Sequence, residues 1–152
     1  MSGLAYTAHH PATAYTNAAS VIAQLVAAAG VPITLKRLEL QANVISSGQA
    51  IAVVQLGSYG TPHAAGTVGT LQPIMRRNSV SPQTAFRYAS ATLGTTFMPW
   101  KTWQWNLAIP WEQQFGDEAL EFQIEGAGNC ALILPSAIGT PTLSAALDIV
   151  ER

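Results

Sequence analysis

Residues 100–125 read WKTWQWNLAIPWEQQFGDEALEFQIE and contain all four tryptophans and five of the eight acidic residues of the chain. Apolar and polar side chains alternate over 103–109, and the alternation recurs over 120–125. A period of two residues is typical of a strand with one buried face. Because Pro110 and Gly116 interrupt this pattern, the segment predicts a strand, a turn and a second strand, with one apolar face and one polar face.

The rest of the chain repeats this short β pattern. The clearest two-faced stretch is 37–44, where leucines alternate with charged and amide side chains. Residues 17–29 fit an alanine-rich helix or a strand, and we favour the strand because a turn follows directly. Further short β-type runs lie at 50–59, 84–89, 130–134 and 143–150. About eight short strands without βαβ alternation predict an all-β protein, a β-sandwich; an eight-stranded jelly roll fits best and an immunoglobulin-like sandwich is the second choice.

The 152 residues suit one domain, since domains cluster at about 100–150 residues. Residues 1–17 are rich in Ala, Thr and Tyr and show no periodicity, so we expect an extended N-terminal arm. Residues 18–152 are then a single β-sandwich domain. The stretch 61–83 also lacks periodicity and is long for a loop in a compact domain, which favours an interface loop.

The composition is poor in charge. Hydrophobic residues make up 49% of the chain and charged residues 10%, against about 25% charged in ordinary soluble domains. With a net charge of −1, copies of the chain repel one another weakly, so we expect buried subunit interfaces and an oligomer. The longest apolar run, 20–33, is interrupted and is shorter than the ~20 residues of a membrane span. We therefore expect no membrane partner, and the absence of basic excess argues against a nucleic-acid partner.

The single cysteine, Cys130, lies in the apolar run 130–134 and has no second cysteine with which to form an internal disulfide. We expect it to be a small buried hydrophobe. The N-terminal sequence lacks the basic and apolar regions of a secretory signal. Both observations favour synthesis in a reducing cytoplasm.

No catalytic histidine pattern stands out. His63 is the only histidine outside the expected arm, and no G-x-S-x-G turn accompanies it, which argues against a hydrolytic triad. His9 and His10 are adjacent, so they would point to opposite faces of any strand and make a poor pair of metal ligands.

The carboxylates give no stronger signal. Glu121 and Glu125 would lie about 13 Å apart along a strand, too far for the paired acids of a glycosidase. A calcium site near Asp117 and Glu118 would lack the D-x-D-x-D-G loop. We therefore expect no enzyme activity, no cofactor and no bound metal.

The tryptophans and the distribution of charge indicate a candidate interaction surface instead. Trp103 and Trp105 alternate in phase with aliphatic residues, which predicts the core, whereas Trp100 and Trp111 lie beside prolines and are freer to be exposed. Net charge is +5 up to residue 101 and −5 over 112–125. This division favours either head-to-tail contacts that close a ring such as a trimer, or pairing within one molecule. The interface candidates are Trp100, Trp111, Arg76, Arg77, Asp117 and Glu118.

The order of features over residues 17–150 resembles small virion proteins of tailed bacteriophages. The similarity rests on ITLKRLELQANVISSG, AIAVVQLGSYGT, TLQPIMRRNSVSPQTA, WQWNLAIPWEQ and LEFQIEGAGNCALIL, followed by a β-rich tail. It is similar to the jelly-roll proteins that decorate or cement phage heads. The resemblance implies a capsid decoration protein made in the host cytoplasm and located in the virion, which forms a homotrimer and binds the major capsid protein or another virion protein. The alternative is a carbohydrate- or receptor-binding module of a phage tail.

Overall fold

The computed structural model describes residues 3–16, 18–45, 51–74, 80–116 and 122–152. This part of the chain contains no α-helix, and antiparallel strands dominate it. The strands are β1 (Leu4–Ala14), β2 (Ser20–Val26), β3 (Ile33–Val44), β4 (Ile51–Thr61), β5 (Thr67–Gly69), β6 (Leu71–Pro73), β7 (Ala85–Ser90), β8 (Thr95–Asn106), β9 (Trp111–Gln114), β10 (Gln123–Ile124), β11 (Asn129–Leu134) and β12 (Thr142–Glu151). The predicted all-β class is confirmed.

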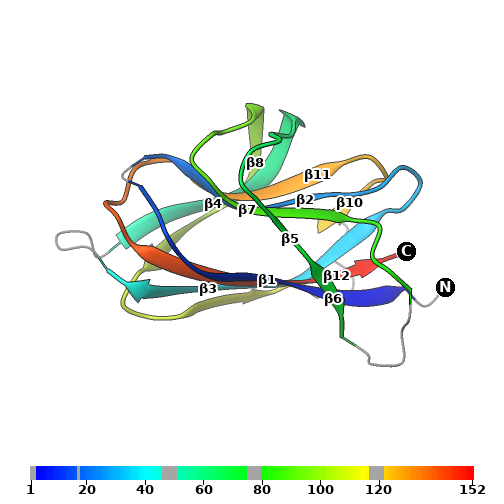
Figure 1. The fold of residues 1–152 in the computed structure, drawn as a ribbon, viewed down its shortest axis with the longest axis horizontal. Coiled ribbons are helices and arrows are strands. Elements are labelled where there is room, and N and C mark those ends of the chain that lie inside the picture. The colour runs from blue at the N-terminus through cyan, green and yellow to red at the C-terminus, as the bar shows by residue number, and fades with distance from the viewer. Residues whose placement is uncertain (1–2, 17, 46–50, 75–79, 117–121) are drawn as a thin grey trace.

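The first four strands pair with strands of the second half of the chain in reverse order. β1 pairs with β12, β2 with β11, β3 with both β10 and β9, and β4 with β8. Contacts of β12 with β3 and of β11 with β4 join these pairs side by side. One sheet therefore has the order β10-β3-β12-β1-β6, with β9 also on β3, and the other has the order β5-β7-β2-β11-β4-β8. The two sheets face each other as a β-sandwich, as predicted (Figure 1).

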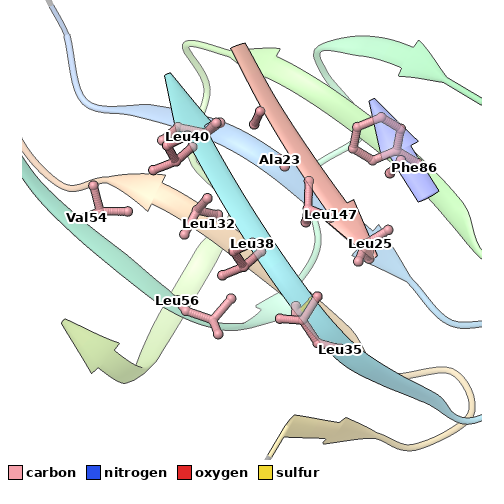
Figure 2. Packing of buried hydrophobic residues seen from close by; sticks show 14 of the residues in the cluster. Ala23, Leu25, Leu35, Leu38, Leu40, Val54, Leu56, Phe86, Leu132 and Leu147 are labelled. Atoms are coloured by element: carbon pink, nitrogen blue, oxygen red, sulfur yellow. The ribbon is translucent and has the colours of Figure 1, made fainter. Parts of the chain in front are cut away.

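The core lies between the two sheets. In β12 every second residue from Leu143 to Ile149 is buried and the residues between them are half-buried. Figure 2 shows Leu38 of β3 beside Leu132 of β11, on the facing sheet. Fully burying one such leucine contributes about 1.5–3 kcal/mol, so these rows supply the main favourable term for folding.

An irregularity in β3 increases the number of its core residues. The ladder between β3 and β12 skips Lys36, which forms a bulge. Leu35 and Leu38 are three positions apart and would face opposite sides of a regular strand, yet both are buried. The bulge thus turns both leucines into the core.

The N-terminal segment differs from the expected arm. Residues 4–14 form β1, which lies inside a sheet between β12 and β6. Tyr6, Ala8 and His10 are buried, and they alternate with residues nearer the surface. Because the inward positions hold an aromatic, a small and a polar residue instead of a row of aliphatic ones, the hydrophobic contrast between the two faces of this strand is weak. The sandwich therefore includes the N-terminal strand, and a boundary at residue 17 does not separate an arm from it.

The stretch 61–83 also contains more order than expected. Its three-residue strands β5 and β6 follow each other directly, and β5 pairs with β7 while β6 pairs with β1. The chain thus passes from one sheet to the other at this edge of the sandwich (Figure 1). Three residues are too few to show a period of two, which is why no strand was predicted here. Its interface role stays a prediction, and residues 75–79 lie outside the described part.

The strands of the tryptophan-rich stretch are shifted from their expected limits. β8 begins at Thr95 and ends at Asn106. Of the strand expected over 120–125, residues 120 and 121 lie outside the described part, and the remainder contains the two-residue β10. Ile109 was expected on the core face but is 60% exposed, because it lies in the turn between β8 and β9. The preferred strand interpretation of 17–29 is confirmed by β2.

Candidate functional site

All four tryptophans lie along one long edge of the sandwich. β8 is the last strand of its sheet, and β9 and β10 lie at the edge of the other sheet beside β3. We call the meeting line of these edges the tryptophan seam, defined by Trp100, Trp103, Trp105 and Trp111. Strands β8, β9 and β10, from the described part of the tryptophan-rich stretch, therefore lie along the same edge of the sandwich.

Aromatic packing between Trp103 and Trp111 holds one part of the seam together. The rings of Trp103 and Trp111 lie with their centroids 5.1 Å apart and their planes at 59°, and both half-buried side chains pack on the core. Trp105 is buried, and its indole Nε1 donates a hydrogen bond of 2.8 Å to the carbonyl oxygen of Ile109. The prediction that Trp105 lies in the core is therefore confirmed. Trp111 is less free than expected, because the ring of Trp103 covers part of it.

Trp100 differs from the other three tryptophans in being exposed, with 37% of its surface accessible. It is the extra residue of a β-bulge: Pro99 pairs with Gly57, Lys101 pairs with Leu56, and Trp100 has no counterpart on β4. Bulges re-aim side chains and are frequent beside binding sites. The exposure predicted for Trp100 is therefore present, and the register of β8 against β4 produces it.

Two hollows open along the seam. The first has a volume of about 300 Å³ and is lined chiefly by Lys101, Trp103, Gln113, Gln114, Phe115 and Phe122. The second, which we call the Trp100 groove, has a volume of about 290 Å³ and is lined by Trp100 together with Ser58, Tyr59, Gln123, Glu125 and Asn129 among others. Both combine aromatic surface with amide or charged groups, which is the usual composition of small-molecule sites.

The glutamines of these hollows were not among the sequence candidates. Gln113 and Gln114 belong to β9 and Gln123 belongs to β10. Gln123 stood at a polar position of the alternation over 120–125, whereas Gln113 and Gln114 lay in the predicted turn and carried no signal. Their placement opposite β8 depends on how two sheets pack, which a period of two does not reveal.

Arg37, from the basic segment, forms ion pairs within the molecule, but its partners Asp148 and Glu39 lie outside the acidic segment 112–125. Arg37 Nε donates a hydrogen bond of 2.8 Å to Asp148 Oδ2, and Arg37 Nη1 lies 3.1 Å from Glu39 Oε2. The hydrogen bond to Asp148 raises the pKa of Arg37, together with the nearby carboxylates. Both ion pairs are partly exposed to solvent, so each contributes at most about 1 kcal/mol. Arg76, Arg77, Asp117 and Glu118 lie outside the described residues, so their interface role stays a prediction.

The histidines occupy separate places. His9 is exposed while His10 is buried, in line with the opposite faces predicted for them. Burial lowers the pKa of both His10 and His63. Within the described ranges, no three His, Cys, Asp or Glu residues gather in a way that could hold a metal ion.

Cys130 is buried and unpaired with any other cysteine, and burial raises the pKa of its thiol to about 12. The expectation of a small buried hydrophobe is confirmed. Among the residues that the structure describes, no helix has the length and apolarity needed to cross a membrane.

Comparison with known proteins identifies no relatives by sequence. No family model matches the chain, and no curated protein matches it. Among solved structures, a chain from the T=1 particles derived from infectious bursal virus aligns with 10% identity and a TM-score of 0.14, over 97% of this chain and 37% of that one. A score this low carries no argument about fold or function.

Proposed function

We propose that the protein is a non-enzymatic structural protein of a virion, a capsid decoration or cement protein that stabilises a phage head. In this proposal it forms a homotrimer, lies on the lattice of the major capsid protein or another virion protein, and reaches the virion after synthesis in the host cytoplasm. The proposal also takes the sandwich as an eight-stranded jelly roll, with β9 and β10 as one interrupted strand.

The order of strand pairing supports the jelly roll. β1, β2, β3 and β4 pair in turn with β12, β11, β10 with β9, and β8. This reversed order is expected when one long hairpin of strand pairs is wound into two sheets, which produces the two Greek keys of a jelly roll. β5, β6 and β7 then form an insertion that widens both sheets at one side.

The observation that carries the assembly role is an exposed apolar surface at one end of the sandwich. Figure 1 shows the end of β3 and the start of β4 at the same end of the molecule. Ile51 pairs with Asn106, whose carbonyl oxygen accepts a hydrogen bond of 3.0 Å from the backbone N–H of Ile109. This surface, which we call the aliphatic end, consists of Val44, Ile45, Ile51, Val53 and Ile109, each between 38% and 60% exposed.

An apolar surface of this kind is unfavourable in water. Contiguous apolar patches on a folded protein mark interaction sites, and covering them contributes about 25 cal/mol per Å². Because the chain is only 10% charged, little repulsion opposes contact between copies. Three copies around a three-fold axis would bring three aliphatic ends together, so that each is covered by both neighbours.

Native mass measured by light scattering at two protein concentrations tests the assembly. We expect three times the chain mass of 16.0 kDa at both concentrations. A protein that stays monomeric at both concentrations would overturn the proposal.

Matched variants locate the contact. Ile51→Glu and Ile109→Glu each place a carboxylate in the aliphatic end and should dissociate the trimer, because a buried unpaired charge is costly. Val68→Glu is the control, since Val68 is 68% exposed on β5, at the other edge of its sheet from β8. If Val68→Glu dissociated the assembly and the two isoleucine variants did not, the aliphatic end would not be the contact.

A further inference from the structure

The Trp100 groove lies outside the aliphatic end, so the proposed capsid role does not use it. The bulge that presents Trp100 requires Gly57 on the neighbouring strand, because a Cβ at that position would collide with the carbonyl oxygen of Met98. Without any side chain at residue 57, the backbone of β8 approaches β4 closely enough to form the bulge. Gly57 on β4 and the bulge on β8 together determine where the exposed indole of Trp100 lies.

Hydrogen bonds hold other parts of the groove's lining in position. Asn129 Oδ1 accepts a hydrogen bond of 2.8 Å from the backbone N–H of Tyr59, and Asn129 Nδ2 donates one of 2.8 Å to the carbonyl oxygen of Tyr59. The backbone of Glu125 is held by a hydrogen bond of 2.8 Å from the N–H of Gly128. A site whose walls are already ordered loses little conformational entropy when a ligand binds.

The residues that line the groove include a flat aromatic ring and several hydrogen-bonding side chains. The amide of Gln123 donates and accepts, the Ser58 hydroxyl does the same, and the Glu125 carboxylate accepts. The face of an indole carries partial negative charge, so it attracts the partly positive C–H hydrogens of a sugar ring. We propose that the Trp100 groove binds a neutral saccharide, with one pyranose ring stacked on Trp100 and its hydroxyls bonded to Gln123 and Glu125.

The size and charge of the groove narrow the ligand class. A volume of about 290 Å³ lies at the small end of ligand pockets, which suits one sugar unit rather than a large cofactor. The groove is open to solvent, so a longer glycan can continue beyond it. Glu125, as the charged group among the lining residues, opposes an anionic ligand. A quaternary ammonium is typically held by a cage of several aromatic rings, whereas of the two aromatic residues that line this groove Tyr59 is buried and Trp100 alone is exposed.

The first test is titration of the full chain with glucose, galactose, mannose, N-acetylglucosamine and their short oligomers. Tryptophan fluorescence and saturation-transfer NMR detect the binding. We expect saturable binding of at least one of these saccharides with a dissociation constant on the order of 1 mM. Choline chloride and inorganic phosphate are the charged alternatives. If no saccharide in the set binds, or if only choline or phosphate binds, the proposal is overturned.

Variants assign the signal to the groove. Trp100→Ala should weaken binding about tenfold or more, while Trp100→Phe, which keeps a ring, should retain most of it. Met98→Ala is the matched control, because Met98 is exposed on the same strand and does not line the groove. Unchanged affinity in Trp100→Ala, or equal loss in Met98→Ala, would overturn the assignment.

Failure of the saccharide proposal can be distinguished from failure of the virion proposal. Trp100→Ala should leave the native mass by light scattering unchanged, because Trp100 is not part of the aliphatic end. If the mass fell and no saccharide bound to the unmodified protein, Trp100 would be an assembly contact and the saccharide proposal would fail alone. If saccharide bound to a monomeric protein, the assembly proposal would fail alone.

Discussion

The rings of Trp103 and Trp111 meet at 5.1 Å between centroids and join the edge strand β8 of one sheet to β9 of the other. Because this contact closes the sandwich at the seam, Trp111→Ala should lower the free energy of unfolding by about 3 kcal/mol. Trp103→Ala should have a similar effect, and a double-mutant cycle should give a coupling of about 1 kcal/mol. Urea denaturation of the four proteins measures these values.

Trp100→Ala is the control for this pair. Its side chain is exposed and belongs to the groove, so its loss should change stability by about 0.5 kcal/mol or less. A coupling near zero between Trp103 and Trp111 would show that the ring contact does not hold the sheets together.

Gly57→Ala tests the bulge. The new methyl group would meet the carbonyl oxygen of Met98 and would lie 2.7 Å from the Phe97 ring atom Cζ. β8 would have to move, so we expect a loss of about 2 kcal/mol in thermal or urea unfolding. Gly116→Ala is the matched substitution, since no atom lies within 4 Å of its added carbon. If both glycine variants were equally stable, the close approach of β8 to β4 would not be needed.

Stability should fall as the pH is lowered below about 6.5, the pKa of an unperturbed histidine. His10 Nδ1 donates to the carbonyl oxygen of Pro11 at 2.6 Å, and Tyr15 donates its hydroxyl proton to His10 Nε2 at 2.6 Å. Burial lowers the pKa of His10 and also that of His63. The unfolded chain therefore binds these protons first, so stability is complete above about pH 6.5 and decreases below it.

Urea denaturation at about pH 7.5 and about pH 5.5 measures this effect, since most carboxylates stay ionised over that range. Each histidine contributes a slope of at most about 1.4 kcal/mol per pH unit. His10→Gln should reduce the slope whatever its effect on the absolute stability. An unchanged slope in that variant would mean that His10 does not govern the acid sensitivity.

Cys130 should be inert to thiol reagents in the folded protein. Burial raises the pKa of its thiol to about 12, so almost no thiolate is present at about pH 8, and the side chain is inaccessible. Reaction with a colorimetric disulfide reagent should be slow until concentrated urea unfolds the chain. The raised pKa also means that stability is complete below about 8.5, the unfolded value, and is lost as the pH rises toward 12. Rapid labelling without urea would contradict this.

Strands with aliphatic alternation could be predicted from the sequence. β3 and β12 carry mostly leucine or isoleucine at inward positions, and both were found within a few residues of their true limits. β1 was missed because its inward positions hold Tyr6, Ala8 and His10. A histidine is a poor hydrophobic marker, and His10 tolerates burial only because Pro11 and Tyr15 satisfy both ring nitrogens.

The candidate site was predicted in part. The exposure of Trp100 could be inferred from its place beside a proline, and the burial of Trp105 from its phase. The groove itself could not be predicted, because it depends on one extra residue in β8 relative to β4 and on the approach of β10 from the other sheet. Register between strands that are 40 residues or more apart in the chain is set by three-dimensional packing.

The place of β12 between β1 and β3 governs when the chain can fold. Leu4 of β1 pairs with Glu151 of β12, so β1 and β3 lack their shared neighbour until β12 has been synthesised. Until then, two central strands have open edges that invite aggregation or chaperone binding. A nascent chain stalled before residue 142 should therefore be digested by protease, and protection should appear only once residues 142–151 have left the ribosome. The sandwich would then become protease-resistant in a single step, when β12 docks between β1 and β3.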